Sequence, residues 1–200
     1  MSSFWYVVGV EAEEQRVGRP RSEQARAAVL NAVDDLLVEG GYAAMTMKNI
    51  AERAGVSRQT VYRWWSTKAE ILFEATAEDA IEEMSIPPSE SPVADLTAYL
   101  EALVRFLVDS PAGIGYRALV GEAQHDAAVA ALLASRDVLG DSAKAVIARS
   151  IDPATLTVTL EQASASLVGP VFFHVLSGRG VDSIDTALLA RQFVGAVGER

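Results

Sequence analysis

The sequence predicts an all-α protein, and three observations support this prediction. Apolar residues recur at spacings of three and four positions along most of the chain, as on one face of a helix. Ser, Thr or Asp precedes several of these segments, and Gly or Pro follows them, which are helix start and stop signals. No segment of any length alternates apolar and polar residues as a half-buried strand would. We therefore expect a helical unit at 19–80 and a second one at 86–200, separated by a Pro-rich breaker.

Residues 1–18 precede the first helical pattern and form an N-terminal extension. The apolar run at 4–8 is too short for a membrane span and lacks the basic flank of a signal peptide. It is a loosely held extension, a strand packed on a partner, or an artefact of start-codon choice. Arg19 and Arg21 belong to a basic stretch at 16–21, which is either an arm reaching nucleic-acid phosphates and the minor groove or a solvated charge cluster.

Two longer helices are expected to enclose the N-terminal unit. Ser22 caps the first, which runs to about Glu39 before Gly40-Gly41 ends it. Thr67 begins the other, which runs to about Glu83 and links this unit to the rest of the chain.

Between them, residues 46–65 predict two short helices joined by a tight turn. Thr46 can cap the first helix by accepting an otherwise unpaired backbone N–H. Gly55 ends it, because glycine takes the positive φ that a residue just past a helix end often needs. Ser57 then caps the second helix. Such a helix-turn-helix presents its second helix to the major groove of DNA.

The second short helix has one apolar and one polar face. Val61 and Trp65 lie four positions apart and are expected to point inward. Arginine can pair with guanine, glutamine with adenine, and a threonine methyl can touch the thymine methyl. The polar face is therefore expected to read bases, and it carries Arg58, Gln59, Thr60, Tyr62 and Arg63. The alternative is a short surface helix of an α-helical enzyme.

Charge is distributed unevenly along the chain. The net charge of −10 alone argues against a nucleic-acid partner. Residues 16–70, however, hold nine Lys and Arg against six Asp and Glu, whereas residues 71–200 hold eight against eighteen. The basic part coincides with the helix-turn-helix, as a phosphate-binding footprint should. There is no cysteine, which excludes disulfides, thiol catalysis and cysteine-based zinc sites and fits a cytoplasmic location.

Residues 19–80 resemble the DNA-binding domain of the TetR (tetracycline-repressor) family of bacterial transcriptional regulators. The resemblance rests on the helix at 26–39, on Gly41-Tyr42, and on the run from Thr46 to Leu72, about a third of the chain. It implies a homodimer that binds a palindromic operator, usually as a repressor that a small molecule releases. It also implies phosphate contacts, which fix position more than sequence, at Thr46, Lys48, Trp64 and Lys68. Trp64 departs from the family, which often has histidine there.

The C-terminal unit is predicted to contain six helices, at 91–109, 114–124, 126–139, 141–149, 152–177 and 184–197. The four residues from Ser110 to Gly113 are expected to form a turn, Gly169-Pro170 to kink the fifth helix, and Ser183 to cap the last. Two segments, at 106–113 and 167–173, carry a weaker resemblance to one TetR C-terminal subgroup, which implies the fold and dimerisation and leaves the ligand open.

An effector pocket is expected within parts of 99–125 and 160–176, because aromatic and polar side chains interrupt otherwise apolar helices there. The candidates are Tyr99, Phe106, Tyr116, Gln124, His125, Phe173 and His174. For each aromatic residue the alternative is an ordinary core position. His125 beside Glu122 and Asp126 would also fit a metal or acid–base site, or simply a polar helix end. No phosphate loop, nucleophile elbow or zinc helix occurs, so we expect no catalysis, metal or cofactor.

The last two helices are apolar over more than one face, which predicts dimerisation as a four-helix bundle. The expected interface residues are Leu167, Val171, Phe172, Val175, Leu189 and Phe193. Two other classes of protein remain open: a helical enzyme that ignores DNA, and a ligand-independent DNA-binding or interaction module. We expect double-stranded operator DNA, a small molecule and a second copy of the chain as partners, and no membrane.

Overall fold

The computed structural model describes residues 18–89 and 91–197, so the expectations for 1–17 lie outside the described residues. Ten α-helices and two short 3₁₀ turns make up this part of the chain, and it contains no strand. The prediction of an all-α fold is therefore confirmed. None of these helices is long and apolar enough to cross a membrane.

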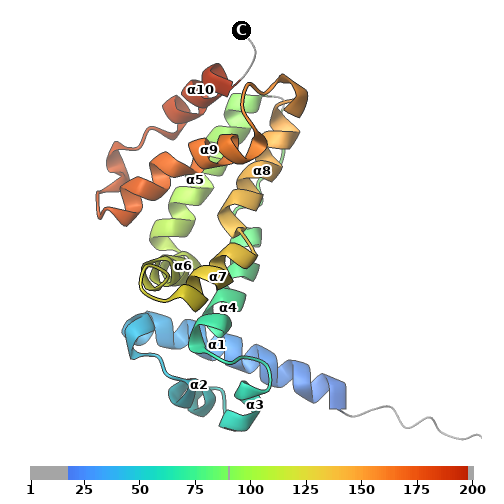
Figure 1. Ribbon diagram of the computed structural model, residues 1–200, viewed down its shortest axis with the longest axis vertical. Coiled ribbons are helices and arrows are strands. Elements are labelled where there is room, and N and C mark those ends of the chain that lie inside the picture. Colours follow the sequence, from blue (N-terminus) through green and yellow to red (C-terminus); the bar gives the residue numbers. More distant parts are fainter. Residues whose placement is uncertain (1–17, 90, 198–200) are drawn as a thin grey trace, which may run out of the picture.

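The N-terminal helices are α1 (Gly18–Ala44), α2 (Met47–Arg53), α3 (Arg58–Tyr62) and α4 (Lys68–Glu83). Figure 1 shows α1 lying across one end of the molecule with α2 and α3 on its outer side, while α4 leads away from it. The prediction that Ser22 caps α1 is wrong, because the helix begins at Gly18. Arg19 and Arg21 consequently lie in its first turns and not in an extended arm. Pro20 is tolerated there because first-turn N–H groups lack intrahelical acceptors. At Gly41 the backbone leaves the helical region with φ of 71°, close to the expected end.

The C-terminal helices are α5 (Pro92–Asp109), α6 (Pro111–Glu122), α7 (Ala127–Ser135), α8 (Val138–Ser150), α9 (Leu160–Leu176) and α10 (Thr186–Val197). Several expected boundaries are wrong, among them the break between α7 and α8, which lies at 136–137 and not at 140. Ser110 is at once the last cap of α5 and the first cap of α6, so the predicted four-residue turn is a single residue. The segment opened by Asp152 is a 3₁₀ turn, and α9 starts only after Thr159. The Asp185 carboxylate, in place of Ser183, accepts from the first turn of α10 at Leu188.

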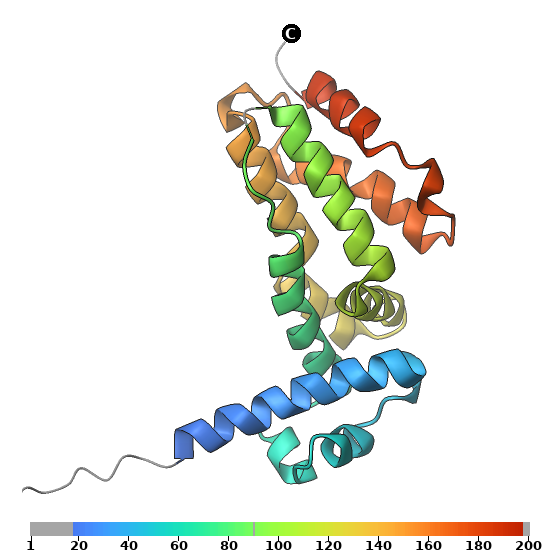
Figure 2. The ribbon, with the colours of Figure 1, turned by 180° about the vertical axis from the view of Figure 1, so that it is seen from behind.

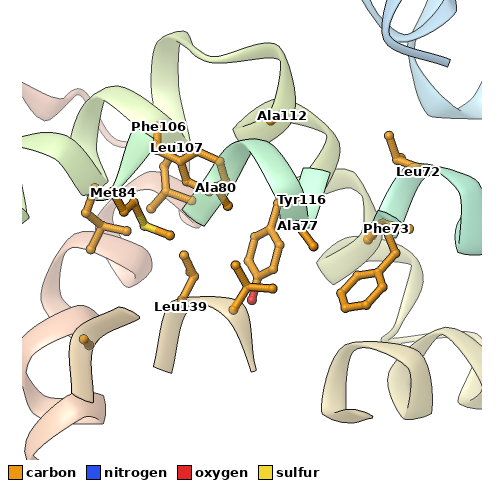
Figure 3. Packing of buried hydrophobic residues seen from close by; sticks show 14 of the residues in the cluster. Leu72, Phe73, Ala77, Ala80, Met84, Phe106, Leu107, Ala112, Tyr116 and Leu139 are labelled. Carbon is orange, nitrogen blue, oxygen red and sulfur yellow. The ribbon is translucent and has the colours of Figure 1, made fainter. Parts of the chain in front are cut away.

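The core continues from one unit into the other, because α4 packs against α1 on one side and against α6 and α8 on the others. Figure 3 shows part of this packing, with Ala77 of α4 beside the Tyr116 ring of α6. Figure 2 shows α9 and α10 at the opposite end of the molecule from α2 and α3. Any influence of the C-terminal helices on the helix-turn-helix must therefore pass through α4, α1 or the helices touching them.

One ionisable group lies half-buried where α1 crosses α4. Burial raises the pKa of Asp34 from 3.8 to about 6, and the charges of Asp79 and Asp35 act in the same direction. A raised carboxyl pKa means that the folded state holds this proton more tightly than the unfolded chain does.

Candidate nucleic-acid interface and C-terminal cavity

Local capping builds the two short helices as the sequence predicted. The Thr46 hydroxyl accepts the Asn49 N–H at 3.1 Å, and the Asn49 side chain accepts the Thr46 N–H at 2.7 Å. Gly55 has a φ of 67°, so the turn after α2 uses the left-handed conformation that favours glycine. The Ser57 hydroxyl accepts the Thr60 N–H at 3.1 Å and thereby caps α3.

The inner face of α3 is fixed by a small core. Val61 is fully buried and Trp65 is 4% exposed, in contact with the cluster that includes Ile50 and Ala51 of α2. Trp64 is half-buried and meets Trp65 edge-to-face, with ring centroids 5.5 Å apart. This core holds the outer face of α3 in one orientation.

Polar side chains cover the outer face of α3. Tyr62 is 55% exposed, and Arg58, Gln59 and Arg63 are also exposed. Neither Arg58 nor Arg63 has a carboxylate within ion-pair distance among the described residues, so both guanidinium groups keep their charge free for a ligand. Arg63 lies 4.7 Å from the Trp64 ring centroid, which restricts its position.

Thr60 of α3 and Lys48 of α2 differ in how much of the side chain is available to DNA. The Thr60 hydroxyl lies 2.9 Å from the Ser57 hydroxyl, which leaves its methyl group as the part suited to a base contact. Lys48 is well exposed, and its ammonium lies 3.8 Å from Glu52, a loose pair that DNA could readily break. By contrast, Arg53 donates to Glu39 at 2.9 Å, lowers the pKa of that carboxyl, and ties α2 to α1.

Lys68 is engaged inside the protein. Its ammonium donates to the Tyr42 carbonyl oxygen at 2.8 Å and lies 4.1 Å from the centroid of the Tyr42 ring. A lysine in the first turn of a helix opposes the helix dipole, so its position there needs an explanation. The explanation predicted from the sequence is a contact with a DNA phosphate. The contact with Tyr42 is a second reason, because it joins the start of α4 to the end of α1.

One contact that holds α3 against α4 is not predictable from the sequence. The Trp65 indole N–H donates to the Glu74 carboxylate at 2.9 Å, and Glu74 also pairs with Arg26 of α1. One turn earlier, the Glu70 carboxylate accepts the Ser66 N–H at 2.7 Å. The only signal in the sequence was a pair of acidic residues one turn apart near the start of α4, which is also typical of a solvated helix.

The C-terminal unit contains a cavity of about 270 Å³ between α6, α8 and α9, referred to below as the α6–α8–α9 cavity. Two aromatic rings line it: Tyr116 of α6 and Phe172 of α9, whose centroids are 6.5 Å apart. Its other lining residues are Asp137, Leu139, Gly140, Glu161, Ser164, Ala165, Val168 and Gly169. Figure 3 shows the Tyr116 ring extending from α6 towards the part of α8 that holds Leu139.

The predicted effector residues do not converge, and of the seven only Tyr116 lines this cavity. Tyr99 and Phe106 are fully buried core residues, because α5 runs through the middle of the unit. Phe173 is 61% exposed on the outer face of α9, and the His174 ring lies 3.1 Å from the Ser183 hydroxyl. Gln124 and His125 are exposed at the end of α6. None of these six residues lines the cavity, and the described residues contain no group of acidic and histidine side chains suited to a metal.

The residues of the predicted dimer face differ in how far they reach the surface. Leu167, Val171, Val175 and Phe193 are each 7% exposed or less, although Leu167 and Phe193 also line a groove between α9 and α10. Phe172 lines the cavity, and Leu189 is half-buried in a groove between α9 and α10. The apolar side chains that remain exposed at this end are Val158, Phe173, Leu176 and Leu188.

A helix-turn-helix with an exposed polar recognition helix, joined through one long helix to a cavity-bearing helical unit, defines a DNA-binding regulator. Residues 29–75 match the pattern described as "Bacterial regulatory proteins, tetR family". Residues 86–195 match the pattern described as "Tetracyclin repressor-like, C-terminal domain". The chain belongs to the TetR family of transcriptional regulators, as the resemblance of residues 19–80 implied.

Relatives agree with this assignment. The HTH-type transcriptional regulator YdeS of Bacillus subtilis is 34% identical over 167 residues, which cover 82% of this chain and 84% of YdeS. The HTH-type transcriptional repressor KstR of Rhodococcus jostii is 30% identical over 93 residues, covering 44% of this chain and 43% of KstR. Among solved structures, the TetR family regulator SCO0332 has a TM-score of 0.65 and 26% identity, covering 86% of this chain and 96% of SCO0332.

Proposed function

We propose that the protein is a cytoplasmic, homodimeric repressor that binds a pseudo-palindromic operator and leaves it when a small molecule occupies the α6–α8–α9 cavity. The observation that carries DNA binding is the outer face of α3. Its two arginines, Arg58 and Arg63, are exposed and have no internal ion pair among the described residues. Free guanidinium groups on a fixed helix suit bidentate contacts with guanine.

Roles within the helix-turn-helix divide between sequence reading and positioning. Arg58, Gln59, Thr60, Tyr62 and Arg63 would contact bases. Thr46, Lys48 and Trp64 would contact phosphates, and so would Arg19 and Arg21, which lie at the start of α1. Lys68 would meet a phosphate only by leaving Tyr42 or by sharing its ammonium hydrogens, of which Tyr42 uses one.

Dimerisation would use the exposed end of α9 and α10. Phe173, Leu176 and Leu188 expose apolar surface there, beside a groove of about 320 Å³ between the two helices. Two such faces related by a two-fold axis could bury each other as a four-helix bundle. The same symmetry would separate the two α3 helices by about 34–36 Å, which is one turn of DNA, or by a whole number of such turns. Each helix could then enter a major groove on the same side of the duplex.

Release from DNA would depend on adjacent residues of α6. Tyr116 lines the cavity, whereas Gly115 lies against Leu37 of α1 and against Leu72 and Thr76 of α4. A ligand that displaces the Tyr116 ring would therefore shift α6 against the helix that holds α3. The ligand acts only to the extent that it binds the DNA-free arrangement more tightly.

Binding without catalysis is part of the proposal, supported by the regulator names of the relatives. The runner-up is a DNA-binding module without any effector, which a cavity lined by an aromatic pair disfavours.

Selection from a randomised duplex library with the intact protein tests the proposal. We expect enrichment of a pseudo-palindrome whose half-sites are separated by about one helical turn of 10–10.5 bp or a multiple of it. Recovery of unrelated sequences would overturn the assignment of sequence reading to α3.

A further inference from the structure

The chemistry of the α6–α8–α9 cavity narrows the class of molecule that fits it. Tyr116 is only 9% exposed, yet its hydroxyl has no hydrogen-bond partner among the described residues. Burial first, and then the nearby Asp137 carboxylate, raise the pKa of Tyr116 to about 12, so this hydroxyl remains protonated at neutral pH. A hydroxyl that makes no hydrogen bond within the protein, at the wall of a cavity, is a group suited to a ligand.

Two carboxylates line the same cavity, and they differ in how far they are neutralised. Glu161 is paired with Lys144 at 2.7 Å. Asp137 accepts the Gly140 N–H at 3.0 Å while capping α8, and no cation lies within ion-pair distance of it in the described part of the chain. The cavity is therefore lined by the exposed carboxylate of Asp137, which has no cationic side chain of the described residues beside it, and by the rings of Tyr116 and Phe172.

We propose that this cavity binds a small organic cation, a protonated amine or amidine joined to a single aromatic ring. The cationic N–H groups would donate to Asp137, and the ring would pack on Tyr116 and Phe172, whose faces also attract positive charge. The Tyr116 hydroxyl would complete the polar contacts. An anion would be repelled by this carboxylate, and a neutral analogue would leave it without a new partner. The volume of about 270 Å³ suits one ring with a short chain.

This inference rests on the proposed effector role of the cavity. It is tested with three compounds of similar shape and different charge: 2-phenylethylamine, 2-phenylethanol and 3-phenylpropionate. Calorimetric titration of the full chain is expected to give at least about tenfold tighter binding of the amine than of the alcohol, and no binding of the carboxylate.

Asp137→Asn is the matched variant, because asparagine caps a helix about as well as aspartate and removes only the charge. It is expected to lose about tenfold in affinity for the amine while leaving binding of the alcohol unchanged. Asp152→Asn is the control. Asp152 also caps a helical turn, at Ala154, but is not among the cavity residues, and its replacement should leave all affinities unchanged.

Equal binding of amine and alcohol, unchanged amine affinity in Asp137→Asn, or no binding of any of the three compounds would overturn the ligand class. The proposed effector role has a separate readout, which is the affinity for the selected operator duplex. An amine that binds through Asp137 and leaves operator affinity unchanged supports the ligand class and contradicts the effector role. If the alcohol, contacting Tyr116, released the operator as well as the amine does, the effector role would be supported and the ligand class contradicted.

Discussion

Replacement of Glu74 by alanine tests whether α4 holds the recognition helix in place. The Glu74 carboxylate accepts the indole N–H of Trp65 at 2.9 Å and pairs with Arg26. Without it, the indole N–H of a residue that is only 4% exposed loses its acceptor. An unsatisfied buried donor costs about 1–3 kcal/mol, and a partly exposed ion pair contributes about 0–1 kcal/mol.

We therefore expect Glu74→Ala to lower the free energy of unfolding by about 2 kcal/mol and to weaken operator binding by about tenfold or more. Glu74→Gln keeps an acceptor for the indole and should lose about half as much stability. Glu78→Ala is the control, because Glu78 is one turn further along α4, 59% exposed and 3.5 Å from Arg26. Guanidinium denaturation followed by tryptophan fluorescence measures the first effect. Identical midpoints and operator affinities for Glu74→Ala and Glu78→Ala would refute the reasoning.

Three further predictions concern the rest of the molecule. Gly115→Ala places a Cβ 2.7 Å from a methyl group of α4 and should lower stability by about 1–3 kcal/mol in calorimetry. Gly121→Ala on the same helix meets open space and should not lower it. Phe173→Asp should yield folded monomers by sedimentation, whereas Phe193→Asp should unfold the subunit; a dimeric Phe173→Asp would contradict the proposed interface. Since the pKa of Asp34 is raised to about 6, stability should fall as pH rises from about 4 to about 6. Asp34→Asn should therefore gain about 1 kcal/mol at pH 7.5, after allowance for solvent screening, and nothing near pH 4; equal gains would refute this.

Local signals made the helix-turn-helix predictable. The caps Thr46 and Ser57 and the positive φ of Gly55 each depend on residues within a few positions of one another. The inward direction of Val61 and Trp65 follows from helical spacing alone. Such features are encoded where they occur, and a single sequence is enough to place them.

Contacts between distant segments were not predictable in this way. The partner of Lys68 is a carbonyl 26 positions earlier, and the partner of Trp65 is a carboxylate on another helix. In α9 and α10 the apolar residues cover more than one face, so spacing alone could not separate core from surface. Spacing therefore predicts Leu167 and Val171 at the dimer interface, although both are only 2% exposed or less within the subunit. The contribution of α8 to the cavity was not predicted, because Asp137, Leu139 and Gly140 lie between the two segments, 99–125 and 160–176, that were expected to line it.

The most direct measurement is the affinity of the wild-type chain and of Arg63→Ala for the selected duplex and for a scrambled duplex, across a range of salt concentrations. Sequence reading by α3 predicts that the wild-type affinity for both duplexes falls steeply with salt. It also predicts that Arg63→Ala loses about 1–3 kcal/mol on the selected duplex and much less on the scrambled one. Equal losses on the two duplexes, or an affinity that does not change with salt, would contradict the assignment of α3 as the reading helix.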